Sequence, residues 1–280
     1  MGTDYQQARS ALGARLRELR VDARLTGAQL AAALNWPPSK VSKLEHGRQT
    51  ATPDDLRLWT EATGTRRTLG ELTSRLQGFE SHIRSWRRQL ANGHGPVQET
   101  WNVEINRTAT IHVWEESVVV GMLQTADYAR HMFLRYTQLH GSARDIEEAV
   151  RARMRRQEWL YEPGRRLRAI MWEAALHALL CPPSALAAQL DRLAGVIGMD
   201  TIELGIVPLS SSLKVPAANG FWILDDRLVI TEDWHAELWL DDEETIGLYA
   251  TVWNTLRESA VYGADAHRLI ARAQSALPKS

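Results

Sequence analysis

Cysteine is almost absent from this sequence of 280 residues, which contains only Cys181. A single cysteine excludes an internal disulfide and cannot form a cysteine-rich zinc site. Because Cys181 stands in an apolar stretch before Pro182, a small buried side chain is favoured over a catalytic thiol. No apolar run approaches the roughly 18 residues that a membrane span needs, and the first residues lack the pattern of a secretion signal. We therefore expect a protein of the cytoplasm that does not enter the membrane.

The motifs of common enzyme classes are also missing. The sequence has no nucleophile elbow, no His-x-x-x-His pair and no phosphate-binding loop. Paired acids occur at Asp225 and Asp226 and again over residues 241–244. They flank predicted strands and a helix start, where roles in turns and at the helix dipole are favoured over metal or glycosidic chemistry. We therefore expect a protein that is not an enzyme and that has no metal and no cofactor.

Charge is distributed unevenly, although the net charge of the whole chain is only −1. Residues 1–90 contain 15 Lys and Arg against 9 Asp and Glu, a net of +6, and residues 91–280 contain 18 against 25, a net of −7. A basic part followed by an acidic part suggests that the first part meets a polyanion such as DNA. A solvated basic surface with no such partner remains the alternative.

Apolar residues at helical spacing predict four short helices between residues 7 and 64. Thr26 and Gln29 form a capping-box pattern at the start of the second helix. The third helix extends from about residue 38 to 46, and Gly47 is placed to end it. The fourth follows Thr52 and Pro53, a proline at the first helical position. These helices predict an all-α domain.

A fifth, long helix is predicted over residues 66–91, and residues 92–96 give the clearest linker pattern in the chain. We therefore expect a DNA-binding domain with its trailing helix over residues 1–91 and a C-terminal domain over residues 97–280. The second domain is expected to be helical to about residue 160 and again up to residue 193. Short β-like runs are predicted at 167–172, 202–207, 220–224, 228–231 and 237–240, before two final helices at 242–259 and 264–276. This pattern predicts an α+β domain with a small sheet.

The segment LTGAQLAAALNWPPSKVSKLEHGR, residues 25–48, resembles the Xre and phage-repressor family of helix-turn-helix proteins. The resemblance covers about residues 10–64 and implies a lambda-repressor-like domain whose third helix reads DNA. The residues themselves support this interpretation, because Val41 and Leu44 turn one side of the third helix inward. The polar side chains of that helix then point outward: Ser39, Lys40, Ser42 and Lys43. A helix of this size fits the major groove, where lysine can bind guanine acceptors; two helices that only pack together are the alternative.

The segment departs from the family at the start of the third helix, where Pro37 and Pro38 replace the usual Ser-Gln pair, and at Gly27, which replaces a glutamine. Glu45 could read cytosine, but the resemblance and the geometry favour a buried ion pair with a residue of the first or fourth helix. Phosphate contacts are expected from Arg15 and Arg48. The residues expected to form the DNA-binding surface are Gly27, Gln29, Pro38, Ser39, Lys40, Ser42, Lys43 and Arg48.

A second resemblance covers residues 101–270. The sequence GMLQT at 121–125, followed by Tyr128-Ala129-Arg130, resembles a PGLLQT…YAR motif of WhiJ-like, antitoxin-like regulators of actinobacteria, although Val120 replaces the proline. The further elements that match this family in order are Trp114-Glu115, the RxxRQxxL pattern of Arg153, Arg156, Gln157 and Leu160, then Glu173, Gln189-Leu190 and Pro208. The resemblance implies a DNA reader joined to a large domain of unassigned chemistry.

The role of the C-terminal domain remains open between two binding functions. Four tryptophans on or beside the predicted strands could line a ligand pocket, although filling of the core is the simpler interpretation: Trp172, Trp222, Trp234 and Trp239. The acidic surface could instead receive a small protein encoded nearby. We therefore expect a transcription regulator that binds a double-stranded DNA operator as a homodimer, because one short helix reads too few base pairs alone. An antitoxin-like module that holds a small partner protein is the alternative.

Overall fold

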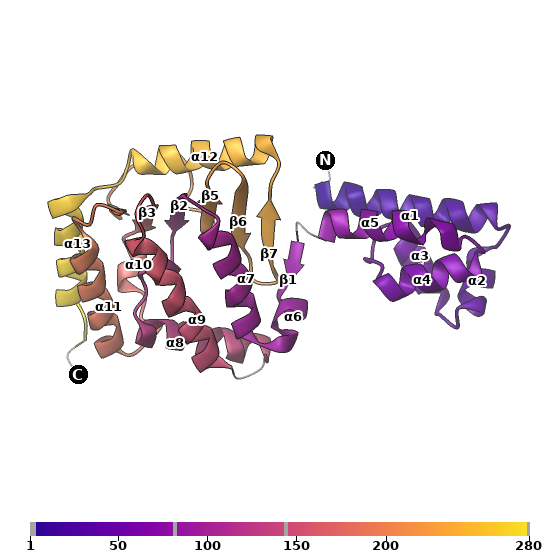
Figure 1. Cartoon of the computed structure of the whole chain (residues 1–280), viewed down its shortest axis with the longest axis horizontal. Helices are drawn as coiled ribbons and strands as arrows, with labels where there is room; N and C mark the ends of the chain where they lie inside the picture. Colours follow the sequence, from indigo (N-terminus) through magenta and orange to yellow (C-terminus); the bar gives the residue numbers. More distant parts are fainter. Residues whose placement is uncertain (1–3, 81–82, 143–144, 279–280) are drawn as a thin grey trace. The chain divides into compact units, whose positions relative to one another are not determined.

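The computed structural model describes residues 4–80, 83–142 and 145–278. The chain forms two compact units, Met1–Ile83 and Arg84–Ser280 (Figure 1). The first unit is helical and the second combines helices with a sheet, which confirms the predicted fold class. None of the helices in the described part of the chain is long and apolar enough to cross a membrane.

The first unit contains the predicted short helices, with bounds close to those expected. They are α1 (Asp4–Asp22), α2 (Gly27–Ala33), α3 (Pro38–Glu45) and α4 (Pro53–Ala62), and a further helix, α5 (Leu69–Glu80), follows them. Thr26 and Gln29 form the predicted capping box at α2, and Gly47, two residues after the end of α3, adopts a φ of 61°. Local sequence signals therefore fix the ends of these helices, because each cap satisfies backbone groups that the helix leaves unpaired.

The core of the first unit gathers apolar side chains from all five helices, including Leu16, Leu44 and Trp59. Trp59 is fully buried and its Nε1 donates to the Leu16 carbonyl at 3.1 Å. Gly13 lies where α1 meets the end of α3: a Cβ there would be only 2.5 Å from the Leu44 carbonyl oxygen. The absence of a side chain at Gly13 thus allows the close approach that orients α3.

The predicted long helix over residues 66–91 is wrong. Helix α5 ends at Glu80, a short strand β1 (Ile83–Ser85) follows, and α6 (Trp86–Gln89) belongs to the second unit. Trp86 is fixed there by its backbone N, which donates to the His235 carbonyl, and by its Nε1, which donates to the Asp233 carbonyl at 2.7 Å. The helical spacing of apolar residues continues across the boundary between the two units. The last apolar residues of this pattern pack in the core of the second unit.

The predicted linker at residues 92–96 is wrong as well, since these residues lie within the second unit. His94 begins α7 (His94–Asn106), and the backbone N of His94 and of Gly95 both donate to the carboxylate of Asp145. Gly93 has a φ of 92°, and a Cβ there would be 2.3 Å from an Asp145 oxygen. The glycines thus serve a tight helix start instead of a flexible connection.

The second unit is built on a sheet of seven strands within the described residues, in the order β1-β7-β6-β5-β2-β3-β4. Strands β2, β3 and β4 are parallel, and β2, β5, β6 and β7 pair antiparallel. The strands besides β1 are β2 (Thr110–Glu115), β3 (Arg166–Trp172), β4 (Ile202–Val207), β5 (Phe221–Leu224), β6 (Leu228–Glu232) and β7 (Ala236–Leu240). The sheet is therefore larger than the small sheet that the sequence predicts.

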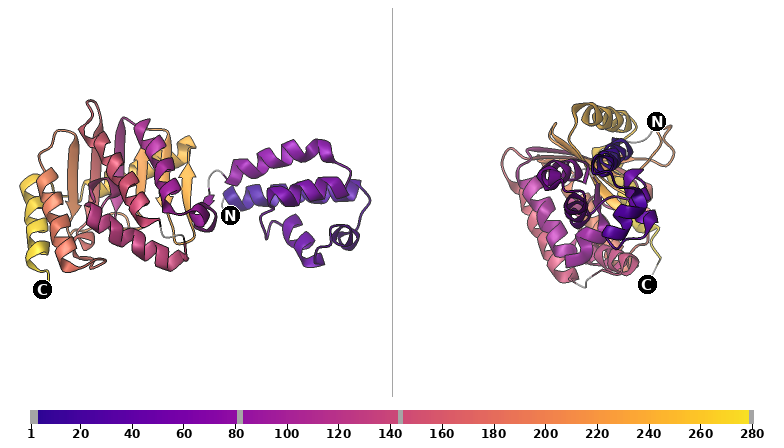
Figure 2. Two further views of the ribbon diagram at one scale, coloured as in Figure 1. Left: turned by 60° about the horizontal axis from the view of Figure 1, so that its bottom comes forward. Right: turned by 90° about the vertical axis from the view of Figure 1, so that its right-hand side faces the viewer.

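Helices cover both faces of this sheet (Figures 1 and 2). On one face, α12 (Glu243–Arg257) packs Trp253 against Trp114 and Ile170. The other face holds the larger core, with Trp101 of α7 and Trp222 of β5. The remaining helices are α8 (Ala126–His140), α9 (Ile146–Arg156), α10 (Ala174–His177), α11 (Pro183–Val196) and α13 (Gly263–Ser275). Neighbouring residues along β2 to β7 thus pack in two different cores, because successive side chains of a strand point to opposite faces of the sheet.

Strand β2 lies in a region that the sequence predicts to be helical. It occupies the centre of the sheet, between β3 and β5, and buries Ile111, Val113 and Trp114. A strand covered on both faces shows no clean alternation of apolar and polar residues, so periodicity does not separate it from a buried helix. The predicted roles of the paired acids are confirmed where the structure shows them: Asp225 accepts from Thr110 N, and Asp242 caps α12.

Candidate functional site

Helix α3 presents a polar, cationic surface next to a buried face. Val41 and Leu44 are buried, whereas Ser39, Ser42 and Lys43 are exposed, as predicted. Arg48, three residues after the end of α3, is also exposed. Neither Lys43 nor Arg48 forms an ion pair within the part of the chain that the structure describes. Both cations therefore remain available for an anionic partner.

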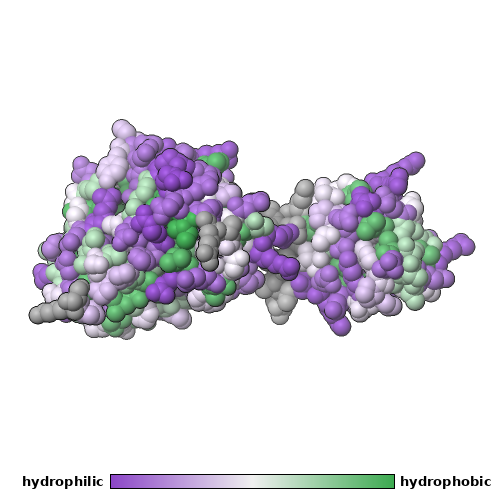
Figure 3. All heavy atoms as spheres, turned by 90° about the horizontal axis from the view of Figure 1, so that it is seen from below, coloured by the Kyte–Doolittle hydropathy of each residue, from purple (hydrophilic) through white to green (hydrophobic). Residues whose placement is uncertain are grey.

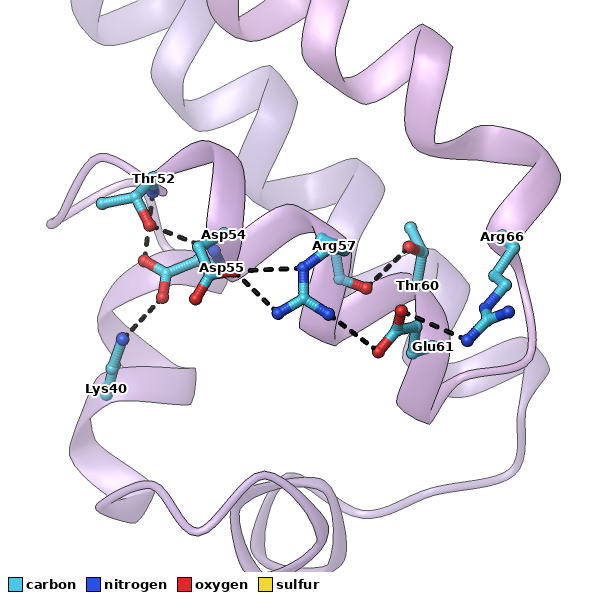
Figure 4. Close-up of polar contacts among 8 residues, drawn as sticks. All are labelled: Lys40, Thr52, Asp54, Asp55, Arg57, Thr60, Glu61 and Arg66. Atoms are coloured by element: carbon cyan, nitrogen blue, oxygen red, sulfur yellow. Dashed lines mark hydrogen bonds and ion pairs between the residues drawn. The ribbon is translucent and has the colours of Figure 1, made fainter.

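Lys40 does not belong to this outward surface, contrary to the prediction. Its Nζ lies 2.6 Å from Oδ1 of Asp55 (Figure 4). The same Nζ lies 3.9 Å from the ring centroid of Trp36. The other carboxylate oxygen of Asp55 accepts from Thr52 N in the cap of α4. Lys40 therefore ties α3 to the first turn of α4, because the Asp55 carboxylate is buried and draws the lysine inward. Its sequence position on the helix gives no sign of this partner.

The Glu45 interpretation is confirmed: this residue is a buried ion-pair partner. Nε of Arg20, on α1, lies 2.5 Å from one Glu45 oxygen and Nη2 lies 2.9 Å from the other. Arg15, expected to contact phosphate, pairs with Glu18 at 2.9 Å and with Glu71 at 3.5 Å. Its charge is thus partly balanced within the first unit, which makes Arg15 a weaker anion contact than Arg48.

The remaining residues of the predicted DNA surface lie at helix starts. Gly27 is the first residue of α2, and Pro38 is the exposed first residue of α3. Gln29 is exposed, but its Oε1 already accepts from Thr26 N at 2.8 Å, so only its amide group can donate to a partner. The two helix N-termini and the side chains of α3 together form the candidate nucleic-acid surface of the first unit.

The second unit contains a cavity of about 210 Å³, which we call the arginine cavity. It lies over one face of the sheet, between α7, α8, α9 and the ends of β2 and β6. Its aromatic lining residues are Trp86, Trp101, Tyr136, Trp222 and Trp234. Its charged lining residues are Glu115, Glu116, Arg153, Arg156, Glu232 and Asp233. A recess with aromatic walls and several convergent charged groups is the usual form of a small-molecule site.

The two arginines of the cavity are held by amide groups. Arg153 donates from Nη1 to Gln124 Oε1 at 2.7 Å and from Nε to Gln98 Oε1 at 3.3 Å. Arg156 donates to the same Gln98 oxygen at 2.9 Å and to Asn102 Oδ1 at 2.7 Å. Neither guanidinium forms an ion pair with a carboxylate among the described residues. Neutral partners fix the geometry of both groups and leave their positive charges uncompensated at contact distance.

Carboxylates face the cavity from two strand ends. Glu115 ends β2 and accepts from Trp222 Nε1 at 3.1 Å, and Glu232 ends β6. Burial, followed by repulsion from Glu232, raises the pKa of Glu115 to about 8. Burial also raises the pKa of Glu116. The cavity thus holds carboxyl groups that lack a close cationic partner.

Two of the four tryptophans predicted for a ligand site line the arginine cavity, namely Trp222 and Trp234. Trp172 does not, because it packs on the opposite face of the sheet with the core under α12. Trp239 packs beside the main core and lies 6.5 Å from the ring centroid of Trp101, outside the lining. Sequence analysis did not assign the glutamates and arginines of the cavity to a ligand site, since they come from three segments far apart in the chain.

The residues that carry the second family resemblance converge on this cavity. Arg153, Arg156 and Glu115 line it directly. Gln157 donates to the Gln124 carbonyl at 2.6 Å, and Gln189 of α11 holds the same loop by accepting from Thr125 N at 2.7 Å. The RxxRQ pattern on a helix was therefore the one sequence signal that could have located the site.

Comparison with known proteins gives a match for each unit. Residues 11–72 match a family described as a helix-turn-helix domain, and residues 99–272 match a family described as a domain of unknown function (DUF5753). No curated protein matches. Among solved structures, TrmBL2, an archaeal chromatin protein described as showing a novel mode of DNA binding, is similar at 13% identity and a TM-score of 0.32. That alignment covers 85% of this chain and 88% of the other, and its TM-score is too low to indicate a shared fold.

The short helix pair, its exposed cationic surface and the family match define the class: the first unit is a helix-turn-helix domain, and the protein is a DNA-binding regulator of that class. The larger match covers most of the second unit. The chain therefore belongs to the DUF5753 family. In this chain, the domain of unknown function follows the helix-turn-helix domain.

Proposed function

We propose that this protein is a sequence-specific transcription regulator whose second unit receives a small ligand in the arginine cavity and thereby changes operator binding. The observation that carries the proposal is the presence of two separate sites in one chain. The first is the exposed surface of α3 with Lys43 and Arg48, and the second is a cavity with charged groups that lack close partners.

The distribution of charge supports the proposal that the first unit binds DNA and the second unit binds the ligand. The second part of the chain is net acidic, so DNA would repel it and its effect on DNA affinity must be indirect. A recess with aromatic walls suits a small ligand better than it suits the phosphate backbone of DNA. We further propose that the second unit binds its ligand without catalysis, as the missing enzyme motifs suggest.

We also propose that the regulator acts as a homodimer on a palindromic operator and belongs with the WhiJ-like, antitoxin-like regulators of actinobacteria. A single recognition helix contacts only a few base pairs, and twofold half-sites double the number. The ordered motifs from Trp114 to Pro208 support the relationship, because several of them hold the cavity described above.

The experiment begins with genome-wide mapping of the sites bound by the tagged full-length protein. On a recovered site, Lys43→Ala and Ser39→Ala should each weaken binding by about 1–3 kcal/mol and leave binding to random DNA nearly unchanged. Fluorescence anisotropy at one fixed salt concentration measures both affinities. Lys214→Ala is the matched control, since Lys214 is an exposed lysine of the second unit that pairs with Glu258. Equal losses on both DNAs would contradict base reading by α3.

A second candidate function is the binding of a small partner protein. Helix α8 exposes Leu134, Tyr136 and Leu139, the last with 59% of its surface exposed. Figure 3 views the side on which α8 lies and shows apolar groups on a mainly hydrophilic surface. Co-purification from the native host followed by mass spectrometry tests this candidate. A small protein in stoichiometric amount, lost on Leu139→Glu, would favour it over the ligand-binding function.

A further inference from the structure

The charges of the arginine cavity are separated into two groups that do not neutralise each other by contact. Arg153 and Arg156 lie side by side on α9 and share the amide oxygen of Gln98. Nη2 of Arg153 donates no hydrogen bond within the described residues. Two adjacent cations without a paired anion favour an anionic group of a ligand beside Arg153.

The carboxylates that line the cavity favour a cation. Glu232 is exposed at the end of β6 and forms no hydrogen bond or ion pair with another described residue. Oε2 of Glu116 is buried and has no hydrogen-bond partner there either. A Cβ at Gly220 would lie 2.7 Å from Glu115 Oε2 and 3.1 Å from Glu116 Oε2, so this glycine provides the space in which the two carboxylates approach each other. Three carboxylates gathered in one recess are stabilised when a ligand brings an ammonium group.

Aromatic rings line the cavity together with these charged groups. Trp101 and Trp222 meet edge to face with ring centroids 5.3 Å apart, and Trp86 lines the same cavity. Their surfaces suit an apolar or aromatic group. At about 210 Å³ the cavity is smaller than the roughly 300–1,000 Å³ of sites for drug-sized ligands. The ligand must therefore be small and must carry both charges.

We propose that the arginine cavity binds a single free amino acid with an apolar or aromatic side chain. The carboxylate of the ligand pairs with Arg153, and its ammonium group lies between Glu232 and Glu115. Its side chain packs against Trp101 and Trp222. The inference rests on the proposed function, since the cavity is the site at which that regulator receives its ligand.

The charge pattern argues against the two other classes of small ligand. A nucleotide would place several negative charges beside Glu115, Glu116 and Glu232. A simple amine would satisfy the carboxylates but would leave the guanidinium groups of Arg153 and Arg156 without an anion. Among these three classes, only a ligand with both charges compensates the arginines as well as the carboxylates of the cavity.

The test is isothermal titration calorimetry of the full-length protein, without DNA, against each of the common amino acids. We expect binding of at least one apolar or aromatic amino acid. Its methyl ester and its N-acetyl derivative, which each remove one charge, should bind at least about tenfold more weakly, equivalent to about 1.4 kcal/mol. Binding by no amino acid, or equal binding of the blocked derivatives, would overturn the inference even if the variants of the cavity fail to fold.

Variants of the cavity test which residues bind the carboxylate and the ammonium group of the ligand. Arg153→Gln and Glu232→Gln should each weaken binding at least about tenfold. The matched controls are Arg155→Gln, an exposed arginine on the same helix, and Glu243→Gln, an exposed glutamate outside the cavity, and both should bind like the unmodified protein. Equal losses in variants and controls would contradict the assignment. Should the amino acid bind without any change in operator affinity, the cavity inference stands and the proposed regulatory function fails.

Discussion

Gly13 and Gly70 occupy two helices of the first unit and have opposite surroundings. A Cβ on Gly13 would lie 2.5 Å from the Leu44 carbonyl oxygen, whereas a Cβ on Gly70 would meet nothing within 4 Å. Gly13→Ala should therefore lower the free energy of unfolding by about 1–3 kcal/mol, because backbone would have to move. Gly70→Ala should leave it unchanged or raise it by up to about 1 kcal/mol. Urea unfolding of both variants measures the difference, and a neutral Gly13→Ala would show that α1 does not touch α3 so closely.

Trp222 and Trp234 both line the arginine cavity, but they differ in burial. Trp222 has 7% of its surface exposed and Trp234 has 74%. Trp222→Ala should lower the free energy of unfolding by about 3–5 kcal/mol, because it removes a packed ring. Trp234→Ala should change it by no more than about 0.5 kcal/mol. Denaturant unfolding of the two variants separates these outcomes, and similar losses would mean that Trp234 is part of the core.

At the scale of the elements, the ends of β2 and β6 give the second unit a dependence on pH. Burial raises the pKa of Glu115 from its ordinary value of 4.5 to about 8 in the folded protein. Between these values the unfolded chain loses the proton that the folded chain retains. The free energy of unfolding should therefore fall as pH rises from about 5 to about 8. This direction is opposite to that of a carboxylate stabilised by an ion pair.

Differential scanning calorimetry tests this dependence through the Tm of the second unit. The Tm of the unmodified protein should fall between about pH 5 and about pH 8, and the fall should be smaller in Glu115→Gln. Glu243→Gln, on the exposed first turn of α12, is the control and should keep the full dependence. An equal fall in all three proteins would show that other groups set the pH response.

At the scale of the whole molecule, the proposed homodimer needs an interface between two copies of the chain. We do not expect the first unit to provide that interface. The apolar side chains of α1 to α5 fill the core of that unit. A fragment of residues 1–80 should therefore be monomeric in analytical ultracentrifugation and should bind a full palindrome poorly, since each half-site would be bound alone. The full-length protein is the control. A dimeric fragment that binds the operator as tightly as the full chain does would move the dimer surface into the first unit.

Local signals in the sequence determined the elements whose ends depend only on neighbouring residues. The capping box of Thr26 and Gln29, the proline start of α4 and the left-handed Gly47 each place a helix end. The strands β3 to β7 were predicted for the same reason, because turn residues separate short runs of β-branched and aromatic side chains. The inward face of α3 followed from the spacing of Val41 and Leu44.

Contacts between distant segments decided the rest. The sequence shows a continuous helical pattern from residue 66 to 91. In the structure, the last residues of this pattern belong to the second unit, because Trp86 forms a hydrogen bond with the segment before β7. The sequence predicts that Lys40 points outward. In the structure its ammonium group pairs with Asp55, 15 residues later in the chain. The arginine cavity exists only where α9 meets the ends of β2 and β6. Folding brings these charged residues together from distant segments, and no local pattern of residues can show that they meet.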